Sequence, residues 1–499
     1  MPSEPAADPG AGGERDDVAV AIALLLALIP FFLAERRLAG AWGLPLDDSW
    51  IHLHFARNIA EGRGFAYNPG VPVAGSTAPL WTLVLGAGAY LIGPSVAMVK
   101  IAGVAAAIAA AILTRRAAVA WGASRLAALG AAVGLGWAGG MAWGALSGME
   151  VPLAAALVAA ALVAHAHDAT MWTAVCAALA VTARPEAIVL VPLLALARPL
   201  TVRRAAVFLG VTAAVLAPAV AFSLATVGSA IPSTAAAKIE GGLVGWLMGV
   251  REAAATTWVG RPSTFVGAWV AWLARTDWLL PAALVPALAG VGWRTGRALA
   301  VPALALIAHP IAMALLAPYR DPGFQEGRYS IHLLPLAFVV LAVALGPRMT
   351  RWRAGLVAVY LLLAVLALPA AASRYGWAVQ NINAMQVHLG RWVDGHLPRN
   401  GPIAVNDIGA IAYVSRREVI DLMGLVSPEV IRYQREGEAG VIRYVTERCP
   451  RHVIVFPAWF PRMTARRDLL EPIYSVKLAH NTVSGADEMV VYRVVGCSR

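Results

Sequence analysis

Residues 18–48 read VAVAIALLLALIPFFLAERRLAGAWGLPLDD, and this stretch indicates the class of the whole chain. Its uncharged first part, residues 18–34, has the length and composition of a helix that crosses a hydrocarbon layer roughly 30 Å thick. No small-residue cleavage site follows, so we interpret this run as a retained first span rather than a signal peptide. The preceding residues 1–17 are rich in Pro, Gly, Asp and Glu, and we expect them to form a disordered cytoplasmic tail.

Similar apolar runs recur along the rest of the chain. Of its 499 residues, 59% belong to the hydrophobic set and 14% are charged, whereas a soluble domain has about 25% charged residues. The sequence therefore predicts an α-helical polytopic membrane protein with about 11 transmembrane helices within residues 18–371. The predicted spans are 18–34, 95–114, 126–140, 150–166, 171–183, 185–197, 205–224, 278–293, 299–317, 331–346 and 352–371.

The arginines between these runs predict the orientation, because basic loops favour the cytoplasmic side of a membrane. The groups at 115–125, 198–204, 294–297 and 348–353 all fall inside if the N-terminus is inside, and Arg36 and Arg37 are the exceptions. The run Leu80–Ile92 is only about thirteen residues long, so we interpret it as a re-entrant or interfacial helix. The outer segments are then the first outer loop 35–94, the turn 147–150, and the stretches 225–277 and 318–330.

The pattern changes after the last span. Residues 372–499 contain short β-rich runs separated by turn and helix patterns, which predicts a small extracytoplasmic α/β domain. Cys449 and Cys497 lie in this part, and both a bridge between them and two unpaired thiols are open. The net charge of +11 does not indicate a nucleic-acid partner, because no basic stripe with interleaved aromatics occurs.

The acidic pair Asp47 and Asp48 opens the most informative part of the first outer loop. The spacing of Ile51, Phe55 and Ile59 behind the pair predicts an amphipathic surface helix. One acid is enough to cap such a helix, so the second needs another use. Sugar transfer with inversion requires a carboxylate that takes the proton of the acceptor hydroxyl. The other aspartate could position the first, bind the sugar or bind a divalent cation, and the sequence does not assign these roles.

Further charged residues stand at predicted outer helix ends. An ionised Glu150 at the membrane boundary costs free energy unless it is hydrated or paired, so a place in a polar cavity is favoured. The alternative is that Glu150 is only the acidic residue at the start of a helix. Arg184 and Glu186 flank a proline and could pair with each other or line that cavity. His52 is expected as a polar cavity residue, because its spacing from His54 disfavours a metal site on one helical face.

Three residues are candidates for binding the phosphate of a donor. Lys238 could supply a point charge, and Arg328 could make a bidentate contact, with His332 close to it in the sequence. The alternative is that Lys238 and Arg328 extend to lipid headgroups.

Several motifs of this sequence occur in the same order as in one known group of proteins. They are Asp47-Asp48, ARNIAEGRGFAYNPG (56–70), GSTAPLW (75–81), SGMEVPL (147–153), TARPEA (182–187), IPSTAAAK (231–238), EGRYSIHLLP (326–335) and VNDIGAIAYVSRREVIDLMGLVSPE (405–429). With them the chain resembles the GT-C superfamily of polyprenyl-phosphate-dependent glycosyltransferases, most closely its bacterial branch that includes the mycobacterial terminal arabinofuranosyltransferases. Two departures are that relatives commonly carry Asn in place of Ser233 and an aromatic near Ala235 or Ala236.

The resemblance implies an inverting glycosyltransferase of the bacterial inner membrane. It would move a monosaccharide from a polyprenyl-phosphate donor to an extracytoplasmic glycan, lipid or protein, with Asp47 and Asp48 as the catalytic centre. The outer domain is compact beside that of the arabinosyl enzymes, which weakens the case for arabinose itself as the sugar. The alternatives are a polyprenyl-linked lipid flippase or transporter, which should carry ionisable groups near the membrane midplane, and a non-catalytic assembly protein that binds the lipid.

Overall fold

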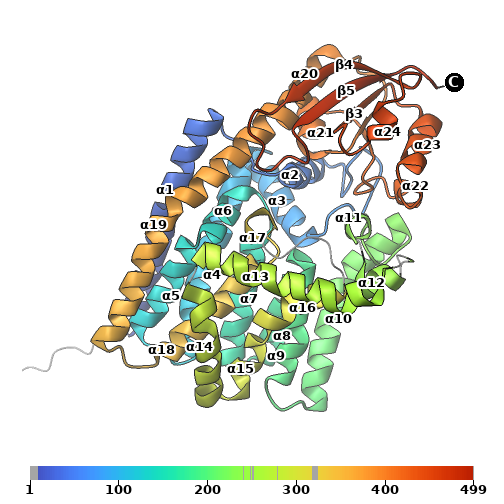
Figure 1. The fold of residues 1–499 in the computed structure, drawn as a ribbon. Helices are drawn as coiled ribbons and strands as arrows, with labels where there is room; N and C mark the ends of the chain where they lie inside the picture. Colours follow the sequence, from blue (N-terminus) through green and yellow to red (C-terminus); the bar gives the residue numbers. More distant parts are fainter. Residues whose placement is uncertain are drawn as a thin grey trace, which may run out of the picture.

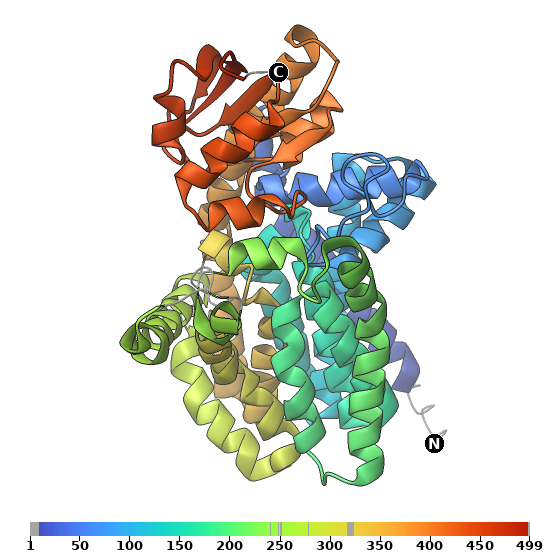
Figure 2. The ribbon, with the colours of Figure 1, turned by 90° about the vertical axis from the view of Figure 1, so that its right-hand side faces the viewer.

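The computed structural model describes residues 9–239, 241–247, 249, 252–277, 279–316 and 324–497. A bundle of long helices forms one end of the molecule, and a small sheet with its helices forms the other (Figure 1). The first outer loop and the segment from α11 (Ser233–Lys238) to α13 (Arg261–Asp277) lie between these two parts (Figures 1 and 2). This intermediate layer contains Asp47, Asp48, His52 and Lys238, and the other predicted site residues stand at or beside ends of the bundle helices.

Every predicted span coincides with one helix or with two consecutive helices. By length and composition, six helical stretches among the described residues can cross a membrane, and α5 with α6, bent by 56°, makes a seventh. The protein is therefore a polytopic membrane protein, although the helices at 151–166, 170–183 and 185–196 are shorter. The helices are α1 (Pro9–Ala39), α4 (Val96–Ala120), α5 (Arg125–Trp137), α6 (Gly139–Ser147), α7 (Val151–Ala166), α8 (Thr170–Ala183), η1 (Pro185–Val189), α9 (Leu190–Leu196), α10 (Val202–Val227), α14 (Leu279–Thr295), α15 (Arg297–Ala303), α16 (Ala305–Leu316), η3 (Ile331–Leu333), α18 (Leu334–Leu345) and α19 (Arg351–Ile382).

Helix α1 begins earlier than the sequence predicts. Residues 9–17, expected within a disordered tail, are helical, whereas residues 1–8 lie outside the described part of the chain. The physical reason is a set of ion pairs: Asp16 contacts Arg125 at 2.6 Å, and Asp17 contacts Arg115 and Arg116 at 2.6 Å. These contacts order the segment and place the start of α1 beside the first group of arginines, as the predicted orientation requires.

Small residues set the packing inside the bundle. A Cβ atom on Gly103 of α4 would lie 2.3 Å from the carbonyl oxygen of Ala145 in α6, so only glycine permits this approach. In the same way, a Cβ atom on Gly376 of α19 would lie 2.9 Å from the carbonyl oxygen of Ala34 in α1. Lipid tails are as apolar as the side chains, so close van der Waals packing is what holds such helices together.

The first outer loop forms two helices, α2 (Asp47–Ala60) and α3 (Pro79–Ile92). The predicted short helix at Leu80–Ile92 is thus present, but the predicted surface helix is wrong, because residues 49–58 of α2 are all buried. Helix α2 packs against both α3 and α21 (Gly409–Ser415) of the C-terminal region. Because α21, which is distant in sequence, covers α2, this amphipathic helix does not lie at the surface.

The C-terminal region contains a five-stranded mixed sheet. Helix α19 runs through the predicted boundary at residue 372 and ends at Ile382, after which the sheet has the order β2-β1-β3-β5-β4. Strands β2, β1 and β3 are parallel, and β5 pairs antiparallel with both β3 and β4. The strands are β1 (Ile403–Val405), β2 (Val419–Asp421), β3 (His452–Val455), β4 (Leu470–Lys477) and β5 (Glu488–Val494), and the helices around them are α20 (His388–His396), α21, α22 (Val430–Gln434), α23 (Glu438–Arg448) and α24 (Pro461–Thr464). Cys449 and Cys497 are both free thiols.

Candidate active site

A cavity of about 330 Å³ lies between the first outer loop, α11 and the ends of the bundle helices. Most of the residues predicted for a site line this cavity, although they come from distant parts of the chain. They are Asp48, His52, Glu150, Arg184, Glu186, Lys238 and Arg328. Asp47 and His332 are the two predicted site residues that do not belong to its wall.

Asp48 stands in the first turn of α2 and faces two cations. Its Oδ2 atom lies 2.8 Å from Nη2 of Arg328 and 3.4 Å from Nζ of Lys238. Burial by itself would raise the pKa of this carboxyl group, but the charges of Lys238 and Arg328 outweigh burial and hold the pKa well below its usual range. Asp48 is therefore ionised at every physiological pH.

Asp47 has a different environment, although it is the adjacent residue. Its Oδ2 accepts a hydrogen bond from the backbone N–H of Gly409 at 2.7 Å, and its Oδ1 accepts one from Ala410 at 2.8 Å. A Cβ atom on Gly409 would lie 2.0 Å from the Asp47 carbonyl oxygen, so glycine is required at this contact. Burial and the nearby Asp407 carboxylate raise the pKa of Asp47, against the effect of the two amide donors. Asp47 thus fastens α2 to the C-terminal region.

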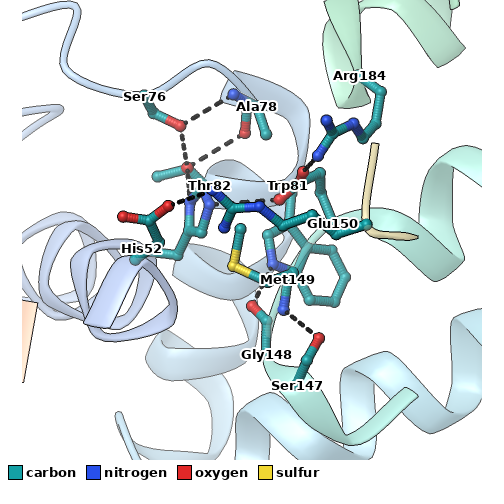
Figure 3. Close-up of polar contacts among 12 residues, drawn as sticks. His52, Ser76, Ala78, Trp81, Thr82, Ser147, Gly148, Met149, Glu150 and Arg184 are labelled. Carbon is teal, nitrogen blue, oxygen red and sulfur yellow. Dashed lines mark hydrogen bonds and ion pairs between the residues drawn. The ribbon is translucent and has the colours of Figure 1, made fainter. Parts of the chain in front are cut away.

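A chain of polar contacts links Arg184 and Glu150 to His52 and continues to Thr82 and Ser76 (Figure 3). Glu150, at the start of α7, pairs directly with Arg184, which also contacts Glu186 at 3.0 Å. His52 Nε2 lies 3.5 Å from the Glu150 carboxylate. The other ring nitrogen of His52 is 3.1 Å from the Thr82 hydroxyl, which in turn is 3.0 Å from that of Ser76. Arg184 therefore compensates part of the charge of the two glutamates, and Glu150 holds His52 at the cavity wall.

Among the described residues that line this cavity, Arg328 has the most unused hydrogen-bonding capacity. The residue is 3% exposed, and its Nη2 contacts both Asp48 and the Tyr329 hydroxyl. Its Nε and Nη1 have no hydrogen-bond partner among the described residues. Buried donors are almost always paired in proteins, so unused guanidinium donors in a cavity wall favour an anionic ligand.

His332 was predicted beside Arg328, but it lies behind the wall of the cavity. It is fully buried, and its ring packs edge-on against that of His309 with 5.1 Å between the centroids. His309, which does line the cavity, and Tyr329, whose ring lies beneath the guanidinium groups of both Arg184 and Arg328, were not predicted. His309 lies within an apolar span, and a single histidine in such a run gives no signal of its direction.

The remaining wall of the cavity is apolar. Its side chains come mainly from η1, the segment after α11, and α16. They are Ile188, Val189, Ile239, Val244, Ala312, Met313 and Leu316. Leu425 of the C-terminal region also reaches the wall, where its carbonyl oxygen accepts a hydrogen bond from the Ser233 hydroxyl at 2.6 Å. The cavity therefore offers a cationic wall to an anion and an apolar wall to a hydrocarbon group.

The carboxylate oxygens of Asp47 and Asp48 are not arranged to bind the divalent cation that the sequence left open for this pair. Asp48 already faces two positive side chains, and both oxygens of Asp47 accept backbone hydrogen bonds. Within the described ranges, no group of three or more His, Cys, Asp or Glu side chains is arranged to hold a metal ion. A divalent cation favours several oxygen ligands, which these contacts do not provide.

Comparisons with known proteins concern the fold and the C-terminal region. Residues 380–492 match a sequence family described as "Domain of unknown function (DUF8728)". No curated protein sequence matches the chain at a significant level.

Two solved structures are similar over almost the whole chain. ArnT from Cupriavidus metallidurans, solved with bound undecaprenyl phosphate, has a TM-score of 0.63 at 12% identity, with 95% of this chain and 97% of that chain covered. The archaeal oligosaccharyltransferase AglB from Archaeoglobus fulgidus, solved with an inhibitory peptide and a dolichol-phosphate, has a TM-score of 0.56 at 12% identity, covering 92% and 73%.

A third similar structure is the arabinofuranosyltransferase AftD from Mycobacteria. Its TM-score is 0.43 at 16% identity, covering 96% of this chain and 41% of that chain. The two stronger matches confirm the predicted resemblance at the level of the fold: this chain has the fold of the GT-C polyprenyl-phosphate-dependent glycosyltransferases.

Proposed function

We propose that this protein is an inverting glycosyltransferase that takes a monosaccharide from a polyprenyl-phosphate donor in the cavity beside α2. The observation that carries the proposal is the meeting of Asp48, Arg328 and Lys238 at one wall of a cavity whose other wall is apolar. A lipid-linked sugar phosphate has the same two parts, an anion and a hydrocarbon chain. The similar proteins that were solved with undecaprenyl phosphate and a dolichol-phosphate support this class of donor.

The cations would bind the donor phosphate. Arg328 has free donors and little exposure, so a phosphate oxygen there gains charge-assisted hydrogen bonds away from bulk water. Lys238 lies on the same side of Asp48 and adds a second positive charge. As the bond between the anomeric carbon and the phosphate oxygen breaks, its electron pair passes to the phosphate, and these cations stabilise the departing charge.

Asp48 would be the general base. The acceptor hydroxyl attacks the anomeric carbon from the side opposite the phosphate, and its proton passes to the ionised carboxylate of Asp48. The neighbouring cations make Asp48 a weak base in the empty cavity. A donor phosphate would draw Arg328 and Lys238 toward itself, so we infer that donor binding strengthens this base.

Asp47 would act by positioning. Its two hydrogen bonds to Gly409 and Ala410 fix the start of α2 against the C-terminal region, and Leu425 of that region reaches the cavity. This arrangement supports the hypothesis that the C-terminal region closes the cavity or recognises the acceptor. The pairing of Asp16 and Asp17 with the arginines at the end of α4 and the start of α5 supports an inside N-terminus, which would place the cavity on the extracytoplasmic side of a bacterial inner membrane.

The experiment is transfer of labelled sugar from a panel of synthetic polyprenyl-phosphate sugars by purified protein. We expect Asp48→Asn to lower transfer about a thousandfold, because the variant cannot take the proton. Asp47→Asn is the matched control, since it makes the same chemical change one residue away, and it should keep transfer within about tenfold of the wild type.

The outcomes separate the proposed function from its rivals. Transfer by wild type that is unchanged in Asp48→Asn would exclude the assigned base. Saturable donor binding without transfer or hydrolysis by any panel member would favour a flippase or a lipid-binding assembly protein instead. Loss of transfer in Asp47→Asn alone, with native unfolding behaviour, would move the base to Asp47.

A further inference from the structure

A second, smaller pocket of about 170 Å³ lies between the end of α2 and the C-terminal region. Four of its nine lining residues are arginines, two from the first outer loop and two from the segment after α21. The lining consists of His54, Arg57, Asn58, Glu61, Arg63, Pro69, Arg416, Arg417 and Glu418. This pocket shares no lining residue with the larger cavity.

Helix α2 separates the two pockets in space. Asp48, Ile51 and His52 line the larger cavity, whereas His54, Arg57 and Asn58 of α2 line the small pocket, with Glu61 directly after the helix. With about 100° and 1.5 Å per residue, the two sets lie roughly 120° apart around the helix and about 10 Å apart along it. The small pocket is therefore a distinct site rather than an extension of the cavity.

The charge of the pocket is positive and incompletely compensated. Glu61 pairs with Arg63 at 2.9 Å, but no carboxylate among the described residues forms an ion pair with Arg57, Arg416 or Arg417. Burial and the adjacent Arg57 guanidinium lower the pKa of His54 to about 3, so its ring adds no charge at neutral pH. The residues of the pocket thus carry four positive and two negative charges.

Two of the arginines are held in place by the protein. Arg57 is 5% exposed, donates to the Tyr413 carbonyl oxygen at 2.7 Å, and lies 4.5 Å from the centre of the Tyr413 ring. Arg417 is 6% exposed and donates to the Leu397 carbonyl oxygen at 2.5 Å, while its Nε and Nη1 have no hydrogen-bond partner among the described residues. Burial of uncompensated guanidinium groups is costly, and an anionic ligand would offset that cost.

From this arrangement we propose that the small pocket is a binding site for an oxyanion, a phosphate or carboxylate group, separate from the donor cavity. Planar guanidinium groups on two sides of a pocket of this size match the geometry of such a group. The exposed Arg63 and Arg416 form its accessible rim. The anion could belong to a soluble molecule or to a lipid headgroup, and the inference rests on no part of the proposed glycosyl transfer.

The test is arginine footprinting of the full-length protein with phenylglyoxal, read residue by residue by mass spectrometry. In detergent, inorganic phosphate should slow modification of Arg63 and Arg416 at concentrations that leave Arg443 unaffected. Arg443 is the matched control, because it is about as exposed as Arg63 and also pairs with a glutamate. Protection of Arg63 and Arg416 in nanodiscs of phosphatidylglycerol but not phosphatidylcholine, without protection by inorganic phosphate, would identify a lipid headgroup as the source of the anion.

A variant provides the second measurement. Arg416→Gln should raise the phosphate concentration that half-protects Arg63 about fivefold, as expected for loss of one partly exposed charged contact, whereas Arg443→Gln should leave it unchanged. Equal protection of Arg443, or no protection of Arg63 and Arg416 by either phosphate or phosphatidylglycerol, would overturn the proposal.

Discussion

Asp47 and Asp48 are adjacent carboxylates, yet they belong to two regions that use charge in opposite ways. On the cavity side of α2, Asp48 faces Lys238 and Arg328, and two donors of Arg328 have no hydrogen-bond partner among the described residues, so the site retains capacity for a ligand. On the junction side, Asp47 is satisfied by backbone amides and lies near the further carboxylate of Asp407. The difference indicates that the first region is arranged for chemistry and the second for holding two parts of the chain together. The following changes test that division.

Among these changes, the largest effect is expected from Arg328→Gln on the cavity side. Removing a buried charge that faces an anion typically costs about 2–5 kcal/mol, so kcat/KM for transfer should fall about a hundredfold or more. Donor affinity, measured by titration with the polyprenyl-phosphate sugar, should fall with it. The thermal unfolding midpoint should fall as well, because Arg328 also pairs with Asp48 in the ligand-free protein, so donor affinity is measured at a temperature where the variant is folded. Normal donor affinity in a folded variant would remove Arg328 from the phosphate site.

On the junction side, Asp407→Asn should change the pH dependence of stability. Burial, with repulsion from Asp48 and Asp421, raises the pKa of Asp407 to about 6, although Gln386 donates a hydrogen bond to it. The folded state then binds a proton more tightly than the unfolded state. This contribution to stability is fully present below the ordinary aspartate pKa of about 4 and is lost as pH rises through about 6.

The asparagine variant removes this titration. It should therefore be more stable than wild type at pH 8, by an amount on the order of 2–3 kcal/mol, and equally stable near pH 4. Unfolding followed at both pH values in the same detergent measures the difference. A stability difference that is the same at both pH values would contradict the assignment.

Asp47→Asn should weaken the junction by about 2 kcal/mol, because the amide group turns a donor toward one of the two backbone N–H groups. Hydrogen exchange at Gly409 and Ala410 should accelerate, while exchange in the bundle helices should not change. Asp47→Glu offers a second variant that keeps the charge and displaces it. Unaltered exchange at both amides in Asp47→Asn would show that this carboxylate does not hold the C-terminal region.

The smallest effect is expected from Lys238→Met, and it concerns the pH dependence of kcat/KM at acidic pH. Lys238 and Arg328 together hold the pKa of Asp48 low, so kcat/KM of the wild type should show no loss from this carboxyl above about pH 4. Loss of one of the two cations should move the acid limb upward by about one pH unit. If kcat/KM of the variant falls at the same acidic pH as that of the wild type, Lys238 does not lower the pKa of Asp48.

The sequence by itself determined the class of the fold and most of the cavity residues. Apolar runs of membrane-spanning length can be recognised locally, because lipid requires every backbone polar group to be satisfied within the helix. Charged residues at the ends of such runs are equally visible, since they are costly there without a role. For this reason Asp48, Glu150, Arg184, Lys238 and Arg328 could be named before their positions in space were known.

Tertiary structure alone decided what separates the two aspartates. The partners of Asp47 are Gly409 and Ala410, more than three hundred residues away. The partners of Asp48 are Lys238 and Arg328. No local sequence pattern encodes either set of contacts. The buried position of α2, the placement of His332 behind the wall and the arginine pocket have the same origin. Each depends on which distant segment covers a residue, because burial and neighbouring charge, rather than residue type, set what a side chain can do.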